Sequence, residues 1–312
     1  MTAGSSMYIG PQGIVHGTTI TVLNAARKQM KKEGEPDDIH GMLFISSGLG
    51  GMSGAQPKAG NIAGVVSVVA EINPLAAEKR YEQGWVDELH YNLDELIPAI
   101  KRSVVEKRVV SMAYVGNVVD LWERLADEGV HVDIGSDQTS LHNPWAGGYY
   151  PADLTLEESK TMMAENPDEF RKHVQASLCR QVAAINRLAA NGMYFFDYGN
   201  SFLKAVYDTG VKSICKNGEN DLDGFIFPSY VEDILGPCLF DFGYGPFRWC
   251  CLSRNPEDLH KTDMAAAEYI KAHNRRYQDY DNYVWVRDAE KNKLVVGTQC
   301  RILYQDAMGR MN

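Results

Sequence analysis

The sequence predicts an α/β protein, a doubly wound parallel sheet embedded in a helical scaffold. Two observations predict it. Apolar runs without a polar face, such as Met42–Ile45, alternate along the chain with segments whose apolar residues recur at helical spacing. A glycine-rich stretch, residues 48–54, follows the first of these runs and leads into a small-residue helical segment. Such alternation favours parallel strands covered by helices on both faces.

The elements follow in order. A helix over 18–32, closed by Gly34, is expected because apolar residues recur there at helical spacing. Pro57 and Pro74 each fit the first turn of a helix, where proline is tolerated. A long helical pattern is interrupted near Asn166–Pro167. The expected strands cover residues 41–45, 67–73, 109–115, 130–134 and 193–199, and the further helices cover 55–65, 93–106, 118–128 and 156–190.

Domain boundaries are set by where the alternation stops. Beyond about Asn217 it weakens, and glycine, proline and aromatic residues become more frequent. A chain of 312 residues suffices for one large domain or two ordinary ones. We therefore expect an N-terminal flank of the scaffold at 1–40, a nucleotide-binding domain at 41–216, and a C-terminal flank at 217–312 that belongs to the substrate and scaffold region.

Composition excludes several classes of function. The formal net charge of −10 argues against nucleic acid as a partner. No run of 18 or more apolar residues predicts a membrane span, and no secretory signal pattern is present. The six cysteines form no C-x-x-C pair. We therefore expect a cytoplasmic protein with reduced thiols and no metal site, in which Cys250, Cys251 and Cys300 are packing residues.

Residues Gly48 to Ser53 fit G-x-G-x-x-S, one residue away from the dinucleotide fingerprint. In that fingerprint glycine permits a tight turn and lets backbone N–H groups and a helix N-terminus approach a pyrophosphate. The alternative is a purely structural turn. Glu71 favours the first reading, because it stands 23 residues beyond Gly48, where an acidic residue bonds the ribose of NAD and repels the 2′-phosphate of NADP. The alternative for Glu71 is a solvated carboxylate at a strand end.

Other polar groups follow the ends of predicted strands, where ligands bind in open α/β sheets. His142 is a candidate general acid or base, or a hydrogen-bonding loop residue. Tyr198 could close over a ligand. Arg248, in "GYGPFRWCC", follows a proline-fixed turn and could bind a substrate carboxylate, or tie a loop to backbone carbonyls.

Five motifs in order make the sequence resemble the urocanase (urocanate hydratase) family along its whole length: "MTAGS" with "YIG" and "QGIVHGT", then "GLGGMSGAQP", "DQTSLHNP", "FDYGN" and "GPFRW". The resemblance implies a Rossmann-like domain and a lyase of histidine breakdown. Such an enzyme adds water to urocanate to give imidazolonepropionate, with tightly bound NAD⁺ as an electrophile. It also implies a homodimer.

The resemblance implies a set of cofactor contacts: Gly51, Met52, Ser53, Glu71, Asn117, Val118, Gln138, Thr139, Ser140, Leu141, His142, Tyr149, Tyr150 and Tyr198. Three departures stand out. Ser53 replaces a frequent glycine, and Ala76 replaces an arginine that many members carry. Leu303 stands at the position where bacterial-type members have a cysteine that is regarded as an active-site residue, and Cys300 would face the opposite side of a strand. No catalytic residue is therefore assigned beyond the candidates Arg248 and His142.

The strings "RDHLD" and "HHGGG", which resemble substrate and acid–base elements of the family, do not occur here. We expect the chain to be a fragment that covers the central NAD-binding region; a naturally short relative is the alternative. Two other functions stay open, an NAD-dependent dehydrogenase and a catalytically incomplete NAD-binding module.

Overall fold

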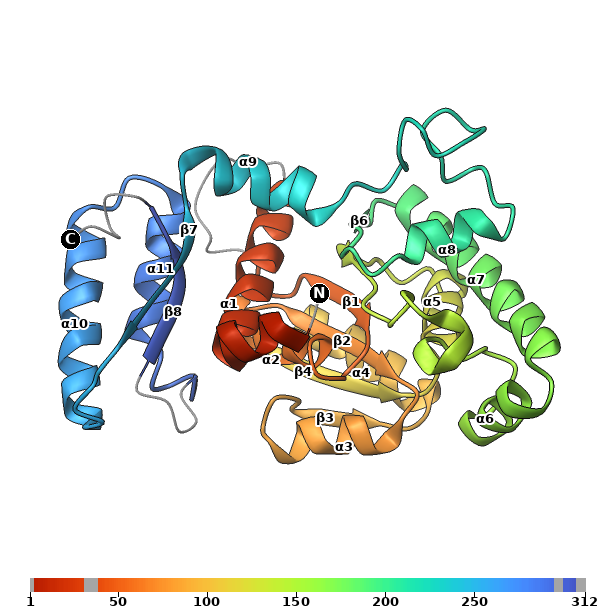
Figure 1. Cartoon of the computed structure of the whole chain (residues 1–312), viewed down its shortest axis with the longest axis horizontal. Coiled ribbons are helices and arrows are strands. Elements are labelled where there is room, and N and C mark those ends of the chain that lie inside the picture. Colours follow the sequence, from red (N-terminus) through yellow and green to blue (C-terminus); the bar gives the residue numbers. More distant parts are fainter. Residues whose placement is uncertain (1–2, 31–38, 295–299, 307–312) are drawn as a thin grey trace. The chain divides into compact units, whose positions relative to one another are not determined.

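The computed structural model describes residues 3–30, 39–294 and 300–306 (Figure 1). These residues form two compact units. The larger unit is Ala25–Tyr230, and the smaller one consists of the described residues of Met1–Asn24 and Val231–Asn312. The units thus change after Asn24 and Tyr230, whereas the boundaries expected from the sequence lie after residues 40 and 216.

The larger unit is built on a six-stranded sheet in the order β3-β4-β2-β1-β5-β6, in which every neighbouring pair is parallel. From β1 the chain adds β2, then β3 at the edge of the sheet and β4 between them, and later continues on the other side of β1 with β5. The predicted doubly wound parallel sheet is confirmed. Its strands are β1 (Leu43–Ser47), β2 (Val66–Glu71), β3 (Glu88–His90), β4 (Val110–Val115), β5 (Ile134–Gly135) and β6 (Tyr194–Phe195).

Helices cover both faces of this sheet because the strands are apolar on both sides. Val68 and Met112 pack with Trp122 in the larger core cluster, whereas Val69 and Ala113 pack with Ala77 in a second cluster on the other face. Alternate residues of β2 therefore enter different cores. From α2 onward the helices of this unit are α2 (Gln56–Ala63), α3 (Pro74–Glu82), α4 (Leu93–Val105), α5 (Val118–Asp127), α6 (Leu156–Glu165), α7 (Pro167–Ala190) and α8 (Phe202–Asp208).

Local signals set several element ends. Asn166 ends α6 and caps α7, and Pro167 occupies the first turn of α7, which confirms the predicted interruption. The predicted bounds of two strands were wrong. β5 occupies only Ile134–Gly135 instead of 130–134, and β6 only Tyr194–Phe195 instead of 193–199, because only these residues find ladder partners in the neighbouring strands.

Helix α1 (Ala3–Met30) contains the predicted helix as far as the structure describes it; residues 31–32 and the expected stop at Gly34 lie outside the described residues. The helix is kinked at Gly10 (φ 69°), next to Pro11. Although α1 is 28 residues long, neither it nor another helix of the described ranges has an apolar stretch that could span a membrane.

The smaller unit contains a two-stranded antiparallel sheet of β7 (Gly245–Cys250) and β8 (Cys300–Gln305). Arg248 therefore lies on a strand. A buried ion pair joins Arg301 to Asp263 at 2.7 Å, and both side chains are 2% exposed. The other elements are η4 (Val231–Leu235), α9 (Gly236–Cys238), η5 (Phe240–Phe242), α10 (Pro256–Ala272) and α11 (Tyr277–Arg287).

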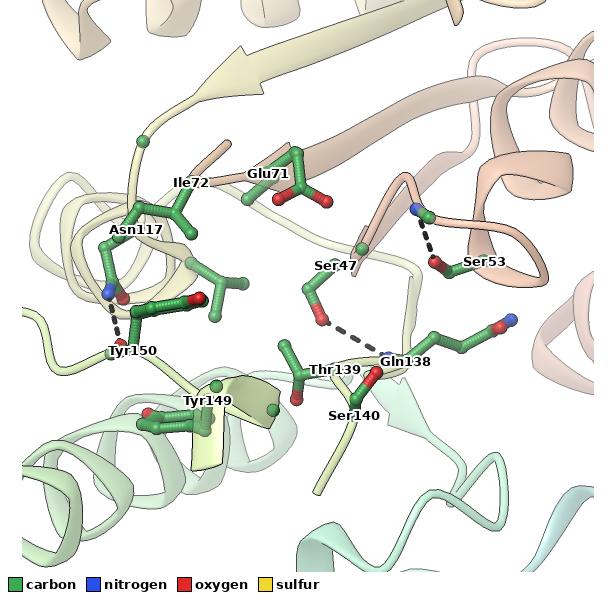
Figure 2. A pocket seen from close by; sticks show the side chains of 17 residues that line it. Ser47, Ser53, Glu71, Ile72, Asn117, Gln138, Thr139, Ser140, Tyr149 and Tyr150 are labelled. Carbon is green, nitrogen blue, oxygen red and sulfur yellow. Dashed lines mark hydrogen bonds between the residues drawn. The ribbon is translucent and has the colours of Figure 1, made fainter. Parts of the chain in front are cut away.

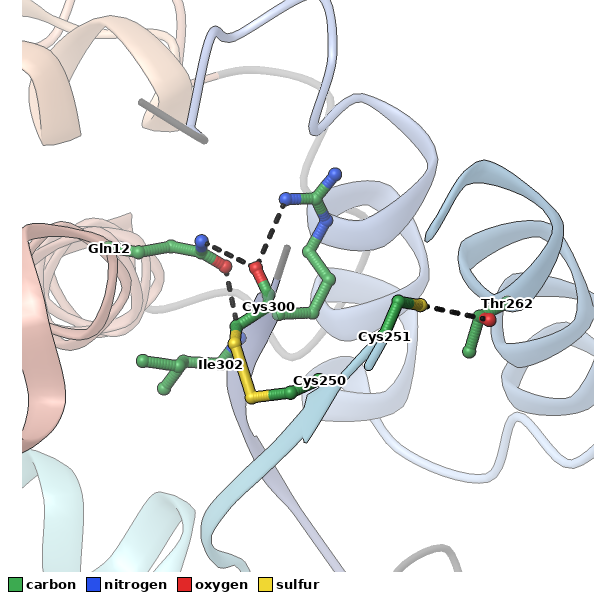
Figure 3. Close-up of a disulfide and its surroundings, with 7 residues drawn as sticks. Gln12, Cys250, Cys251, Thr262, Cys300 and Ile302 are labelled. Atoms are coloured by element: carbon green, nitrogen blue, oxygen red, sulfur yellow. Dashed lines mark hydrogen bonds between the residues drawn. A yellow bond between two sulfur atoms is a disulfide. The ribbon is translucent and has the colours of Figure 1, made fainter. Parts of the chain in front are cut away.

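Cys250 and Cys300 face each other across this ladder and form a disulfide (Figure 3). The prediction of reduced thiols is wrong for these two residues. They are 50 residues apart in the sequence, and only the register of β7 against β8 brings them together. Cys251, the next residue, is free, and its sulfur contacts the hydroxyl of Thr262.

Candidate functional site

A pocket opens at the carboxyl ends of the central strands of the larger unit (Figure 2). Segments that follow β1, β2, β4 and β5 all contribute to it. This edge, between β1 and β5, is where the direction of winding reverses, which is the usual ligand site of open α/β sheets. The lining residues are Ser47, Gly48, Gly50, Ser53, Ala70, Glu71, Ile72, Gly116, Asn117, Val118, Gln138, Thr139, Ser140, Gly147, Gly148, Tyr149 and Tyr150.

The glycine-rich turn after β1 needs glycine at its first position. Gly48 has φ 90°, and a Cβ there would lie 2.8 Å from the Ser53 hydroxyl. Gly50 differs, because its φ is not positive and a Cβ would meet only that hydroxyl, at an ordinary 3.6 Å. The fold therefore requires glycine at position 48 but leaves space for a side chain at the pocket-lining position 50.

The backbone N–H groups of this turn fall into two sets: some donate to other groups of the protein, and others lie at the start of a helix. The N–H groups of Gly48, Leu49 and Gly50 donate to Ala70 O, Glu71 Oε2 and Ser53 Oγ, at 2.8, 2.8 and 3.0 Å. Residues 51–53 follow, at the start of the short helix η2 (Ser53–Ala55), where N–H groups have no acceptor in a preceding turn. Helix α2 continues from there and has no side-chain cap at its N-terminus. Such a start is suited to an anion.

Glu71, at the end of β2, holds the turn from the other side. Its Oε2 accepts from Leu49 N–H at 2.8 Å and its Oε1 from Asn73 N–H at 2.9 Å. The side chain is partly buried and lines the pocket. Each carboxylate oxygen keeps a second lone pair for a ligand hydroxyl. Glu71 is thus anchored between two loops, which the solvated strand-end reading did not predict.

Asn117, which follows β4, joins the end of that strand to the far wall of the pocket. Its Oδ1 caps α5 by accepting from Val119 N–H at 2.9 Å, and its Nδ2 donates to the carbonyl of Tyr150 at 2.8 Å. In this wall a Cβ at Gly148 would lie 2.1 Å from the carbonyl oxygen of Ser140. The close backbone approach at Gly148 thus shapes the pocket between residues 140 and 150.

The strand-end residue Asp137 is a buried carboxylate beneath the pocket, and the sequence assigned it no role of its own. Asp137, 1% exposed, accepts from Ser47 Oγ, Gln181 Nε2 and Asn200 Nδ2 at 2.7, 2.8 and 2.7 Å. Tyr149 donates its hydroxyl to Gln181 Oε1 at 2.8 Å, and burial, with the charge of Asp137, raises the pKa of Tyr149 well above its usual value. The strand-end position of Asp137 was the only signal in the sequence; Gln181, inside a long helix, offered none.

The pocket brings together nine of the fourteen residues that the resemblance implies: Ser53, Glu71, Asn117, Val118, Gln138, Thr139, Ser140, Tyr149 and Tyr150. Five do not line it. Leu141 is buried in the core, Tyr198 stacks on Tyr230 with ring centroids 4.6 Å apart, and His142 is exposed, with Nδ1 2.9 Å from the Ser201 hydroxyl. Gly51 and Met52 lie at the helix start beside the pocket. The lining residues Ser47, Ala70, Ile72, Gly147 and Gly148 were not predicted, although each lies within two positions of a predicted one.

The remaining candidates lie on the sheet of the smaller unit. Arg248 is exposed on β7, opposite Ile302 in the ladder. On β8 the alternation of burial puts Leu303, 1% exposed, on the face opposite to Cys300, as predicted. Among the described residues, no group of three or more His, Cys, Asp or Glu side chains gathers where it could hold a metal ion.

Residues 10–234 match the model of the urocanase Rossmann-like domain, and residues 238–312 match that of the urocanase C-terminal domain. The chain belongs to the urocanase family. Within the family it is 52% identical to the "Probable urocanate hydratase" of Caenorhabditis elegans over 324 residues, which cover 100% of this chain and 47% of that protein. It is 48% identical to the "Urocanate hydratase" of Mus musculus and of Homo sapiens, each over 100% of this chain and 47% of the relative. The chain thus spans about half the length of the curated relatives it matches.

Proposed function

We propose that this chain supplies the NAD-binding part of a urocanate hydratase and holds NAD⁺ in the pocket at the carboxyl edge of its sheet. One observation carries the proposal. The glycine-rich turn, the helix start and Glu71 meet at a single pocket, located where a doubly wound sheet reverses its winding. The names of the relatives, "Urocanate hydratase", supply the reaction type, hydration of urocanate, and the product imidazolonepropionate is what the family resemblance implies.

The residues present fit a dinucleotide. At Gly50 the missing side chain lets a pyrophosphate approach the backbone, and the N–H groups of 51–53 are oriented by the helix start. The lone pairs of Glu71 suit ribose hydroxyls, and its charge disfavours a 2′-phosphate. We therefore propose NAD rather than NADP.

When bound, NAD⁺ would supply an electrophilic ring that activates urocanate toward water. The residues of this pocket then bind and orient. Asn117 fixes the wall at Tyr150, and the buried Asp137 fixes the floor. Tyr149 is turned toward Gln181 and its pKa is raised, so its hydroxyl is not a proton donor to the pocket. We assign the proton transfers of the reaction to no residue of this pocket.

Native mass spectrometry of the purified chain tests the cofactor. A mass excess equal to NAD, lost on denaturation, is expected, either as purified or after NAD is added. A chain that carries no NAD and takes up none at millimolar concentration would refute the proposal.

Ultraviolet absorbance then separates the functions. Loss of urocanate absorbance without NADH indicates hydration, and formation of NADH indicates the dehydrogenase alternative. NAD bound without either signal indicates a binding module that needs further segments. We propose the homodimer from the family resemblance, and light scattering tests it. We propose the cytoplasmic location from the four described cysteines that stay free, Cys179, Cys215, Cys238 and Cys251, and cell fractionation tests it.

A further inference from the structure

We infer that Arg80 is a positioning residue of the NAD site: it sets the direction of the peptide groups in the glycine-rich turn. This inference rests on the proposed function. Arg80 lies near the C-terminal end of α3 and does not line the pocket. Its guanidinium donates through Nε to the Leu49 carbonyl at 3.2 Å and through Nη2 to the Gly50 carbonyl at 2.6 Å. The third nitrogen donates to Gln83 Oε1 at 2.8 Å.

These two contacts help to hold two successive peptide planes, and the Gly50 carbonyl also accepts from Gly54 N–H at 3.0 Å. The structure describes no cis peptide, and in a trans peptide the C=O and the following N–H point in opposite directions. A Leu49 carbonyl held toward Arg80 therefore turns the Gly50 N–H away from it, and this N–H donates to Ser53 Oγ at 3.0 Å. In the same way, the held Gly50 carbonyl turns the Gly51 N–H away from the guanidinium. Gly51 is the first of the three donors proposed for the pyrophosphate.

Arg80 also brings a positive charge to the turn. All three of its hydrogen-bond partners are neutral groups, and in the part of the chain that the structure describes no carboxylate forms an ion pair with it. It is half-buried, and burial lowers the pKa of its guanidinium, which still stays protonated at neutral pH. A cation bonded to these carbonyls polarises the peptide groups and strengthens their N–H groups as donors to an anion.

The turn is shaped to receive this side chain. A Cβ at Gly54 would lie 2.2 Å from Arg80 Nε, and the three atoms nearest to it all belong to the guanidinium. The φ of Gly54 is not positive, so its backbone would accept alanine if Arg80 were absent. Glycine at position 54 therefore allows the guanidinium to pack closely against the turn. Arg80 is one helical turn beyond Ala76, so α3 still directs an arginine at the cofactor loop, although not at the position that many family members use.

The test is a double-mutant cycle on the full 312-residue chain, with affinity measured by isothermal titration calorimetry for NAD and for adenosine. Arg80→Ala should weaken NAD binding about tenfold, since one charge-assisted hydrogen bond loses its alignment. Adenosine lacks the pyrophosphate and should bind as before, which a general loss of folding would not allow. Arg80→Lys keeps the positive charge but loses the forked guanidinium, so its NAD affinity should lie between those of the wild type and Arg80→Ala. Lys79→Met, which removes an exposed charge from the neighbouring position, is the control and should bind NAD normally.

Gly54→Ala alone should displace the guanidinium and weaken NAD binding as much as Arg80→Ala. In the Arg80→Ala background it should cost almost nothing further, so the two effects are not additive. If the wild type binds NAD, any of three results would overturn the inference. These are normal NAD affinity in Arg80→Ala, an equal loss of affinity for NAD and adenosine, and additive effects of the two substitutions. A wild-type chain that binds no NAD would instead overturn the proposed function, and this inference with it.

Discussion

Replacing Gly50 separates the two readings of the glycine-rich turn, a ligand cradle or a structural turn. Gly50 lines the pocket, yet its backbone accepts a side chain, because its φ is not positive and a Cβ would lie 3.6 Å from Ser53 Oγ. Gly50→Ala should therefore leave the free energy of unfolding within about 1 kcal/mol of the wild type. Gly48→Ala, with φ 90° and a 2.8 Å contact, should lower it by about 1–3 kcal/mol.

The effect of Gly50→Ala on NAD binding should be much larger than its effect on stability. The methyl group would occupy the surface that the pyrophosphate approaches, so at least one charge-assisted hydrogen bond is lost, about 1.5–3 kcal/mol. The dissociation constant for NAD should then rise roughly 10- to 100-fold. Calorimetry measures it, and thermal unfolding confirms the fold. Gly17→Ala, at a position in α1 with open space around the Cβ, is the control. Unchanged NAD affinity in Gly50→Ala would refute the cradle.

Three further predictions concern other parts of the chain. Glu71→Ala should weaken NAD binding by about 1–3 kcal/mol and reduce the preference over NADP, as measured by titration with both cofactors. His16 is buried and its folded pKa is lowered to about 3. Its contribution to stability is therefore present above pH 6.5 and is lost as the pH falls toward 3, at up to about 1.4 kcal/mol per pH unit; His16→Phe should flatten that slope in denaturant titrations. Cys300→Ala should lower the free energy of unfolding by about 2–4 kcal/mol, and a reductant should bring the wild type to the same value. A wild type that ignores the reductant would contradict the disulfide prediction, and Cys179→Ala is its control.

The strand–turn–helix at residues 43–63 could be predicted because its determinants are local. Leu43–Ile45 are consecutive apolar residues, all buried, and glycine at position 48 permits the positive φ that starts the turn. Glu71 could be placed because β2 pairs with β1 in parallel register, which carries its end to the same edge. The ends of strands β5 and β6 were less predictable, because they depend on which residues find ladder partners and not on strand propensity.

The alternation of strands and helices, the edge of the sheet that holds the candidate site, and the family of the chain can all be inferred from the sequence alone. Which polar groups meet depends on the packing of distant segments. Asp137 finds Gln181 from α7, Cys250 finds Cys300, and Arg80 reaches the turn from α3. Local backbone preferences are written in neighbouring residues, whereas such contacts depend on register and helix packing between segments distant in the chain, and no spacing in the sequence encodes them.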